Sequence, residues 1–336
     1  LTGSLMSTEP EQFFTEMSST NFSSVPWHTL VILLTAAVLI FGVSGGIEKI
    51  NKVMMPAFFI LFIIIAVRVA FLPNAIEGYK YLLVPQWEYL FNPRTWIMAM
   101  GQAFFSLSLG IAAMEIFGSR VGTERSLNGE AINITVLNTV VAILAGLIIF
   151  PACFAYGVSP DAGPSLVFVT LPMVFGQMPL GNVWGALFFL LMSFAALSTV
   201  IAVFENLVGW FMDKFDMTRG RAVAWNAALV VVLSLPCALG FNVWSGIAIP
   251  GIGDIQSIED FIVSNNMLPL GSLIFVIFCT TKFGWGWDKF IEEADKGKGV
   301  KLPVRFRLWY KYGIPVLIVI IFVMGYVPKI SAWMGV

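Results

Sequence analysis

The segment Gly101–Gly110, GQAFFSLSLG, places two hydroxyl side chains between glycines inside a membrane-length apolar stretch. Lipid cannot satisfy free backbone groups, so a helix-weakening sequence at that depth survives only beside protein or a water-filled cavity. If the helix unwinds near Ser108, carbonyls and hydroxyls become free to bind a cation or a polar ligand. A helix restarting near Ile111 then directs its positive N-terminus toward an anionic group such as a carboxylate. The alternative is that Ser and Gly only permit close helix packing, and spacing alone weighs the two equally.

A second group of oxygen atoms is expected on one face of a later helix. Residues three and four apart share a helical face, so the Ala195 carbonyl converges with the hydroxyls of Ser198 and Thr199. These are uncharged oxygen ligands, which suit hard cations. The competing interpretation is that both hydroxyls bond back to their own helix. Taken alone, that second interpretation is favoured.

Few ionisable or strongly polar residues lie inside the apolar stretches, and such residues are functional hypotheses by default. Glu115 follows the expected break, Glu205 lies midway along a long apolar helix, and Asn138 lies in the inner half of another. For Glu205 the favoured interpretation is a buried carboxyl satisfied by neighbouring backbone groups. His28 is the only histidine, and neither a catalytic triad nor a metal cluster can be built around it.

Composition defines the class of protein. The 336 residues are 58% hydrophobic and only 12% charged, whereas soluble domains carry about 25% charged residues. The formal net charge is −1, so no basic surface suggests a nucleic-acid partner. Phosphate-cradling and dinucleotide-binding glycine motifs are missing from the sequence. We therefore expect an all-α integral membrane protein and not an enzyme.

Apolar runs of about 17 residues or more indicate spanning helices, and we predict eight. The fifth is too long for a perpendicular span, so it tilts or projects into the cytoplasm. The first is short unless it begins near Val25. The predicted spans are Leu30–Val43, Val53–Leu72, Thr95–Gly118, Ile132–Tyr156, Trp184–Met212, Ala222–Leu239, Phe261–Thr281 and Tyr310–Tyr326.

Basic residues orient these spans. With the N-terminus outside, 15 of the 19 Lys and Arg residues fall on the cytoplasmic side, as positive residues prefer. The outer stretch Ser159–Gly181 contains four prolines, yet its middle, Ser165–Phe175, is apolar. We predict that this stretch folds back onto the bundle as a lid. A second outer stretch, Phe241–Asp260, ends in two acids just before a predicted helix, where a positive N-terminus favours them.

Three longer segments carry a family resemblance. GQAFFSLSLG, LLMSFAALSTVIAVFENLVGWFMD and AGLIIFPACFAYGVSPDAGPSLVFVTLP resemble the bacterial branch of the neurotransmitter:sodium symporters. The best-known interrupted transporter helices belong to this same family. The break predicted near Ser108 and the family resemblance are therefore not independent indications of function. The resemblance implies two inverted five-helix repeats, with this chain corresponding to helices four to eleven. Because the sequence starts at Leu1 and lacks counterparts of helices one to three, we expect a piece of a longer protein.

The resemblance also implies a single transmembrane domain over residues 1–336 and a function for it. We expect 1–27 to be an outer loop, 28–94 the end of the first repeat and an outer loop, 95–282 the second repeat, and 283–336 a cytoplasmic loop and the last helix. The implied function is sodium-coupled symport of an amino acid or related small amine across the bacterial plasma membrane by alternating access. Lipid and a small-molecule substrate are the expected partners, and a homodimer is left open. Since the first helix of the family supplies about half of each sodium site, we expect these residues alone to bind neither ion nor substrate tightly.

Site residues follow from the resemblance by position. Ser106 and Asn138 resemble ligands of the first sodium site, whereas the second sodium site would use Ala195, Ser198 and Thr199. Asp260 resembles an outer-gate acid, and Gln102 a residue near the anion site of chloride-dependent relatives. The substrate-pocket positions are Phe105, Ser106, Ser108, Gly110, Ile111 and Val203.

Three departures from the family pattern matter. Arg120 replaces a tyrosine that helps to close the inner gate, Glu115 is an unexpected acid, and Ala142 stands where many relatives have serine or an acid. Chloride dependence is therefore in doubt. The alternative function is a non-transporting relative, either a decayed remnant or an amino-acid sensor. A milder variant keeps transport and lets Glu115 replace a bound anion or couple a proton. Ile111 favours a bulkier apolar or aromatic substrate.

Overall fold

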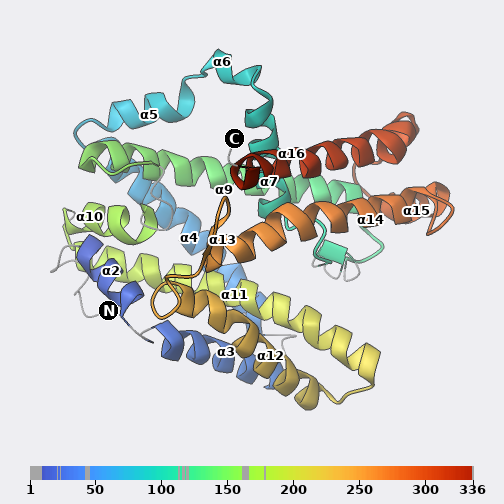
Figure 1. Ribbon diagram of the computed structural model, residues 1–336, viewed down its shortest axis with the longest axis horizontal. Coiled ribbons are helices and arrows are strands. Elements are labelled where there is room, and N and C mark those ends of the chain that lie inside the picture. The colour runs from blue at the N-terminus through green and yellow to red at the C-terminus, as the bar shows by residue number, and fades with distance from the viewer. Residues whose placement is uncertain are drawn as a thin grey trace. The chain divides into compact units, whose positions relative to one another are not determined.

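A computed structural model describes residues 10–20, 22, 24–41, 46–112, 114–115, 118, 121–160, 166–177 and 179–334. Most of this described structure is helical (Figure 1). The chain divides into two units, each with its own core. The first unit consists of Leu1–Pro85 and Val141–Ser245, and the second of Gln86–Val140 and Gly246–Val336.

The first unit is built from apolar helices joined by short connections. Its elements are α2 (Pro10–Ser19), α3 (Ser24–Phe41), α4 (Gly46–Ala70), α5 (Ala75–Leu83), η1 (Leu166–Thr170), α10 (Leu171–Gly176), α11 (Gly181–Phe215) and α12 (Arg219–Gly240). Helix α9 (Leu127–Tyr156) begins in the second unit and ends in the first.

The second unit contains the interrupted helix and the C-terminal helices. Its further elements are α6 (Trp87–Leu90), α7 (Pro93–Ser106), β1 (Ala248–Ile249), β2 (Gly253–Asp254), α13 (Ile255–Asp260), η2 (Phe261–Met267), α14 (Leu268–Thr280), α15 (Trp287–Ala294), η3 (Val304–Phe306), η4 (Trp309–Gly313) and α16 (Ile314–Met334).

Six helices among the described residues are long and apolar enough to cross a membrane. They correspond to six of the eight predicted spans, and the other two are shorter helices. Helix α3 has 18 residues and begins at Ser24 rather than at Leu30. Helix α7 has only 14 residues because the chain leaves the helical conformation after Ser106. The predicted span Thr95–Gly118 is therefore not one continuous helix.

Two apolar clusters hold the first unit together. One joins α4, α9, α10 and α11, and Ile65, Ala152 and Phe175 have no exposed surface there. The other joins α3, α11 and α12 around Leu39 and Val208, and Figure 1 shows these three helices running beside one another. In lipid, such contacts stabilise the helices through close packing rather than through removal from water.

The apolar middle of Ser159–Gly181 packs against the first unit's core, and its role as a lid stays a prediction. Val174 and Phe175 on α10 are at most 1% exposed. Arg68 near the end of α4 donates a hydrogen bond to the Gln177 carbonyl at 3.3 Å, which ties this segment to α4. Residues 161–165 and 178 of the segment lie outside the described residues.

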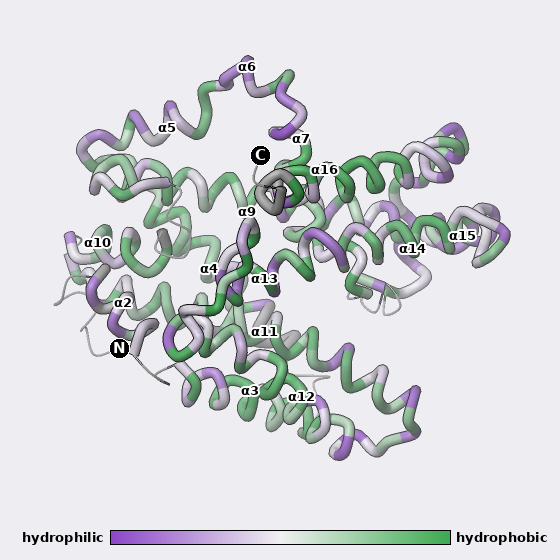
Figure 2. Tube along the Cα trace, in the orientation of Figure 1, coloured by the Kyte–Doolittle hydropathy of each residue, from purple (hydrophilic) through white to green (hydrophobic). Residues whose placement is uncertain are grey.

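In the second unit, α7 and α16 pack on α14 around Phe104, Leu268, Ile318 and Ile321. Figure 2 shows α14 and α16 apolar along most of their length, with polar residues gathered at α15. Helix α15 lies within the charged stretch 283–307, for which the sequence predicts only a cytoplasmic loop. The stretch packs on the residues just before α9, where the Lys298 N–H donates to the Glu124 carbonyl at 2.8 Å.

The stretch before α14 corrects one prediction. Strands β1 and β2 form a hairpin, and the helical stretch begins at Ile255, so the two acids Glu259 and Asp260 lie inside the continuous helix Ile255–Thr280 instead of just before it. Asp254 takes the favourable place at the helix start, where its carboxylate accepts a hydrogen bond from the Ser257 N–H at 2.9 Å. Hydrogen bonds from the Ser257 hydroxyl and N–H lower the pKa of Asp254.

Candidate functional site

Helix α7 has a fixed beginning and an abrupt end. The Asn92 side chain accepts a hydrogen bond from the Arg94 N–H at 3.0 Å, and Pro93 occupies the first turn. Both features are typical of helix N-termini. The helix ends at Ser106, and residues 107–112 form turns and bends. The interruption predicted within Gly101–Gly110 is therefore confirmed, whereas residues 113, 116–117 and 119–120 lie outside the described part of the chain.

Gly110 is the position in this break where only glycine fits. Its φ is +82°, and a Cβ placed on it would lie 2.3 Å from the Leu268 carbonyl oxygen and 2.6 Å from the Ser272 nitrogen. Ser108 and Ala112 also have positive φ values, 51° and 62°, which L side chains rarely adopt. The break is thus a strained backbone held by direct contact with α14.

Two of the predicted first-site ligands meet in the second unit. The Asn138 amide Nδ2 on α9 donates a hydrogen bond to Ser106 Oγ, the last residue of α7, at 3.3 Å. This bond uses one lone pair of the hydroxyl and leaves the amide oxygen of Asn138 as a further acceptor. Two uncharged oxygen atoms that could coordinate a cation, the Ser106 hydroxyl and the Asn138 amide oxygen, therefore belong to side chains that meet where α7 ends.

The predicted oxygen cluster on α11 is also present, in the first unit. The hydroxyls of Ser198 and Thr199 both donate to the Ala195 carbonyl, at 2.8 and 3.2 Å. The bonding back to the same helix that the competing interpretation expects is therefore observed. It still gathers three oxygen atoms on one face, and each hydroxyl oxygen keeps lone pairs that can bind a cation.

Glu205 has a different partner from the one its sequence position suggests. Its carboxylate forms a two-pronged ion pair with Arg219 of α12, at 2.6 and 3.3 Å, rather than being satisfied only by nearby backbone. Arg219 also donates through Nε to the Leu39 carbonyl at 2.8 Å, so one guanidinium joins α11, α12 and α3. Glu205 is thus a structural residue of the first unit.

The predicted substrate contacts are accessible. Phe105, Ile111 and Val203 are 56%, 39% and 43% exposed, and Gln102 and Glu115 are exposed as well. The gate candidate Asp260 is exposed at the end of α13 and accepts a hydrogen bond from the Ser264 hydroxyl at 2.7 Å. Arg120 lies outside the described residues.

Sequence reasoning missed the part of α14 that supports the break. A Cβ on Gly271 would lie 2.0 Å from the Gly110 carbonyl oxygen, so two backbones touch without side chains between them. The neighbouring Ser272 is 8% exposed, and its hydroxyl has no hydrogen-bond partner among the described residues. The only sequence signal was the adjacent small pair Gly271-Ser272 in an otherwise apolar helix.

Known proteins resemble this chain over most of its length. The sodium-dependent transporter YhdH of Bacillus subtilis (strain 168), itself uncharacterised, is 35% identical over 292 residues, which are 86% of this chain and 64% of that protein. An uncharacterised sodium-dependent transporter of Haemophilus influenzae is 34% identical over 88% of this chain and 64% of its own length. The sodium-dependent serotonin transporter of Drosophila melanogaster is 26% identical over 90% of this chain and 49% of that protein. The chain thus spans less than two thirds of the length of these relatives.

A solved structure agrees with the fold. The crystal structure of MhsT in complex with L-phenylalanine superposes with a TM-score of 0.85 at 35% sequence identity, covering 94% of this chain and 71% of that one. Residues 11–333 match the profile of the sodium:neurotransmitter symporter family. The chain is a multi-pass, all-α membrane protein with an interrupted helix, and it belongs to the sodium:neurotransmitter symporter family.

Proposed function

We propose that the protein containing this chain couples the inward movement of sodium to uptake of an amino acid by alternating access. The interruption of α7 carries this proposal. It brings two serine hydroxyls, a turn of non-helical backbone and the Asn138 amide into one apolar stretch, where lipid alone would offer such groups no partner. The names of the bacterial relatives as sodium-dependent transporters support it.

Sodium would be held by two groups of neutral oxygen atoms. Ser106 and Asn138 would contribute to one site, and the Ala195 carbonyl with the Ser198 and Thr199 hydroxyls to the other. Oxygen donors without formal charge suit a hard monovalent cation. Ions that bind one conformation better than the other shift the population toward it, which is how a sodium gradient would drive the cycle. Because Ala142 offers no polar group at the expected anion position, we propose that transport does not require chloride.

The substrate would be an apolar or aromatic amino acid. Its carboxylate would meet the backbone of the turn at residues 107–110, and its side chain would contact Phe105 and Ile111. Val203, in the first unit, is a third substrate position that the family resemblance implies. All three side chains are exposed and apolar, which favours a bulky apolar substrate. L-phenylalanine, which is bound in the MhsT crystal structure, is therefore the first substrate to test. Asp260 would act at the outer gate.

The test is sodium-dependent L-phenylalanine uptake into proteoliposomes, using the full-length protein that contains this chain. Ser106→Ala and Asn138→Ala should each raise the sodium concentration for half-maximal uptake about tenfold, the effect of losing one ion-dipole contact of about 1.4 kcal/mol. Thr139→Val is the matched control, because its hydroxyl donates to the Thr135 carbonyl of its own helix. An unchanged sodium requirement in both variants contradicts the proposed site.

The same measurement separates transport from sensing. Tight sodium-dependent binding of L-phenylalanine without any uptake identifies a sensor instead of a transporter. The role proposed for Glu115 in coupling a proton or replacing an anion is tested in the same vesicles. A Glu115→Gln protein with unchanged pH and chloride dependence eliminates that role.

A further inference from the structure

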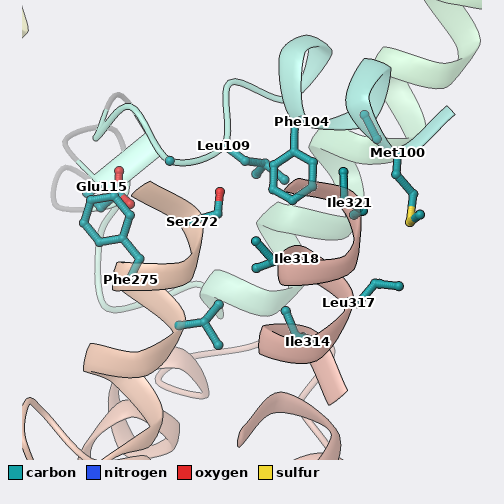
Figure 3. Close-up of a pocket in the computed structure, with 13 residues that line it drawn as sticks. Met100, Phe104, Leu109, Glu115, Ser272, Phe275, Ile314, Leu317, Ile318 and Ile321 are labelled. Atoms are coloured by element: carbon teal, nitrogen blue, oxygen red, sulfur yellow. The ribbon is translucent and has the colours of Figure 1, made fainter. Parts of the chain in front are cut away.

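A cavity of about 300 Å³ lies in the second unit, on the side of the break that faces α14 and α16 (Figure 3). Its walls are mostly apolar and come from α7, the turn after it, α14 and α16. A volume of this size is at the lower end of the range in which proteins hold small ligands. The cavity is therefore large enough for a compact organic molecule.

Two polar side chains line this cavity. Figure 3 shows Glu115 beside Phe275 at one end, Met100 at the other, and Ser272 between them. The Ser272 hydroxyl is buried without a hydrogen-bond partner among the described residues, which costs free energy unless a ligand supplies one. No basic side chain is among the 13 lining residues that Figure 3 draws. The cavity thus combines an apolar body with a negative end.

The cavity lies on a different face of α7 from the proposed transport site. Successive residues of a helix point about 100° apart. Phe104 lines the cavity and is 8% exposed, whereas Phe105 is 56% exposed and Ser106 faces Asn138. Of the proposed sodium and substrate contacts, only the neighbouring residues Leu109 and Gly110 border both regions. A ligand in the cavity would therefore contact the break on the side that faces α14 and α16, without contacting the proposed sodium ligands.

We propose that this cavity binds a small apolar amine. The hydrocarbon part packs against Phe104, Leu109 and Ile318, and the ammonium group pairs with the Glu115 carboxylate. A carboxylate on the ligand would be repelled by Glu115, so amines without a carboxylate are preferred over amino acids. The site is distinct from the proposed substrate pocket, and its occupancy does not depend on sodium.

The probe is 2-phenylethylamine, measured by calorimetry on the purified protein in potassium chloride without sodium. We expect binding to the wild type and about tenfold weaker binding to Glu115→Gln, because a charge-assisted hydrogen bond contributes about 1.5 kcal/mol. Glu292→Gln, which changes an exposed acid of the same unit that does not line the cavity, should bind like the wild type. L-phenylalanine should give no heat under these conditions.

Two further variants keep the test independent of how well one protein folds. Ile318→Trp fills the cavity and should abolish binding, while Ser272→Ala removes the unpaired hydroxyl and should weaken it about threefold. Equal binding by wild type and Glu115→Gln overturns the proposal. So does binding that requires sodium and is displaced by L-phenylalanine, since it then belongs to the substrate pocket. A wild-type protein without sodium-dependent L-phenylalanine uptake contradicts the proposed transport function and leaves the cavity result unaffected.

Discussion

Gly101 and Gly110 lie at the two ends of one segment but have opposite requirements. Gly101 lies inside α7, and a Cβ built there meets nothing within 4 Å. Gly110 has a left-handed backbone and contacts the backbone of α14. Glycine weakens a helix interior through its backbone freedom, whereas it is required where the backbone is left-handed and closely approached. The residue type is the same, and only the surroundings decide what it contributes.

Alanine substitution at these two positions should therefore change stability in opposite directions. Gly110→Ala should lower the free energy of unfolding by about 2–4 kcal/mol, because the added methyl group combines backbone strain with overpacking against Leu268. Gly101→Ala should raise it by up to about 1 kcal/mol through helix propensity. Unfolding in mixed detergent and denaturant measures both. Equal effects of the two variants would show that α14 does not constrain the break.

At the scale of elements, one guanidinium joins three helices of the first unit. Arg219 lies in the first turn of α12, where the helix dipole disfavours a positive charge. Its contacts with Glu205 on α11 and with the Leu39 carbonyl on α3 offset that cost. The Arg219 and Glu205 side chains are 33% and 17% exposed, so water screens the pair only in part.

Replacement of this guanidinium should weaken the packing of the three helices. Arg219→Lys keeps the charge but cannot donate in a planar fork to both carboxylate oxygens and a carbonyl. We expect a loss of about 2 kcal/mol of stability, seen as a lower thermal unfolding midpoint in detergent. Arg221→Lys is the control, because Arg221 is exposed on the same helix. A midpoint that falls equally in both variants would assign the effect to replacing any arginine of α12 by lysine, and not to the contacts of the Arg219 guanidinium.

For the whole molecule, the long apolar runs predicted the six long helices, and the Ser and Gly residues near Ser106 predicted the break. Other features depend on contacts between residues distant in sequence. The partner of Glu205 is 14 residues away, on the other side of the connection between α11 and α12, and Ser272 meets Gly110 only in the folded chain. The start of α13 at Ile255 depends on the preceding hairpin placing Asp254 as its cap. Neither periodicity nor composition contains that information.

Orientation is also a property of the whole chain, and the excess of basic residues predicts that the N-terminus is outside. In a cysteine-free background, Glu292→Cys on α15 should react with a membrane-impermeant maleimide only after the membrane is opened. Glu77→Cys on α5 should react in intact cells, since both side chains are accessible. Reaction of the two cysteines in the reverse pattern would invert the proposed topology.

The contact between Gly110 and Gly271 has a mechanical consequence. Most helices touch through side chains, whose rotamers absorb small shifts of one backbone against another. Here the Gly110 carbonyl lies against α14 with no side chain in between, so this compliance is missing. A displacement of α14 toward the break must therefore push the turn after α7, because no side chain can yield between the two backbones.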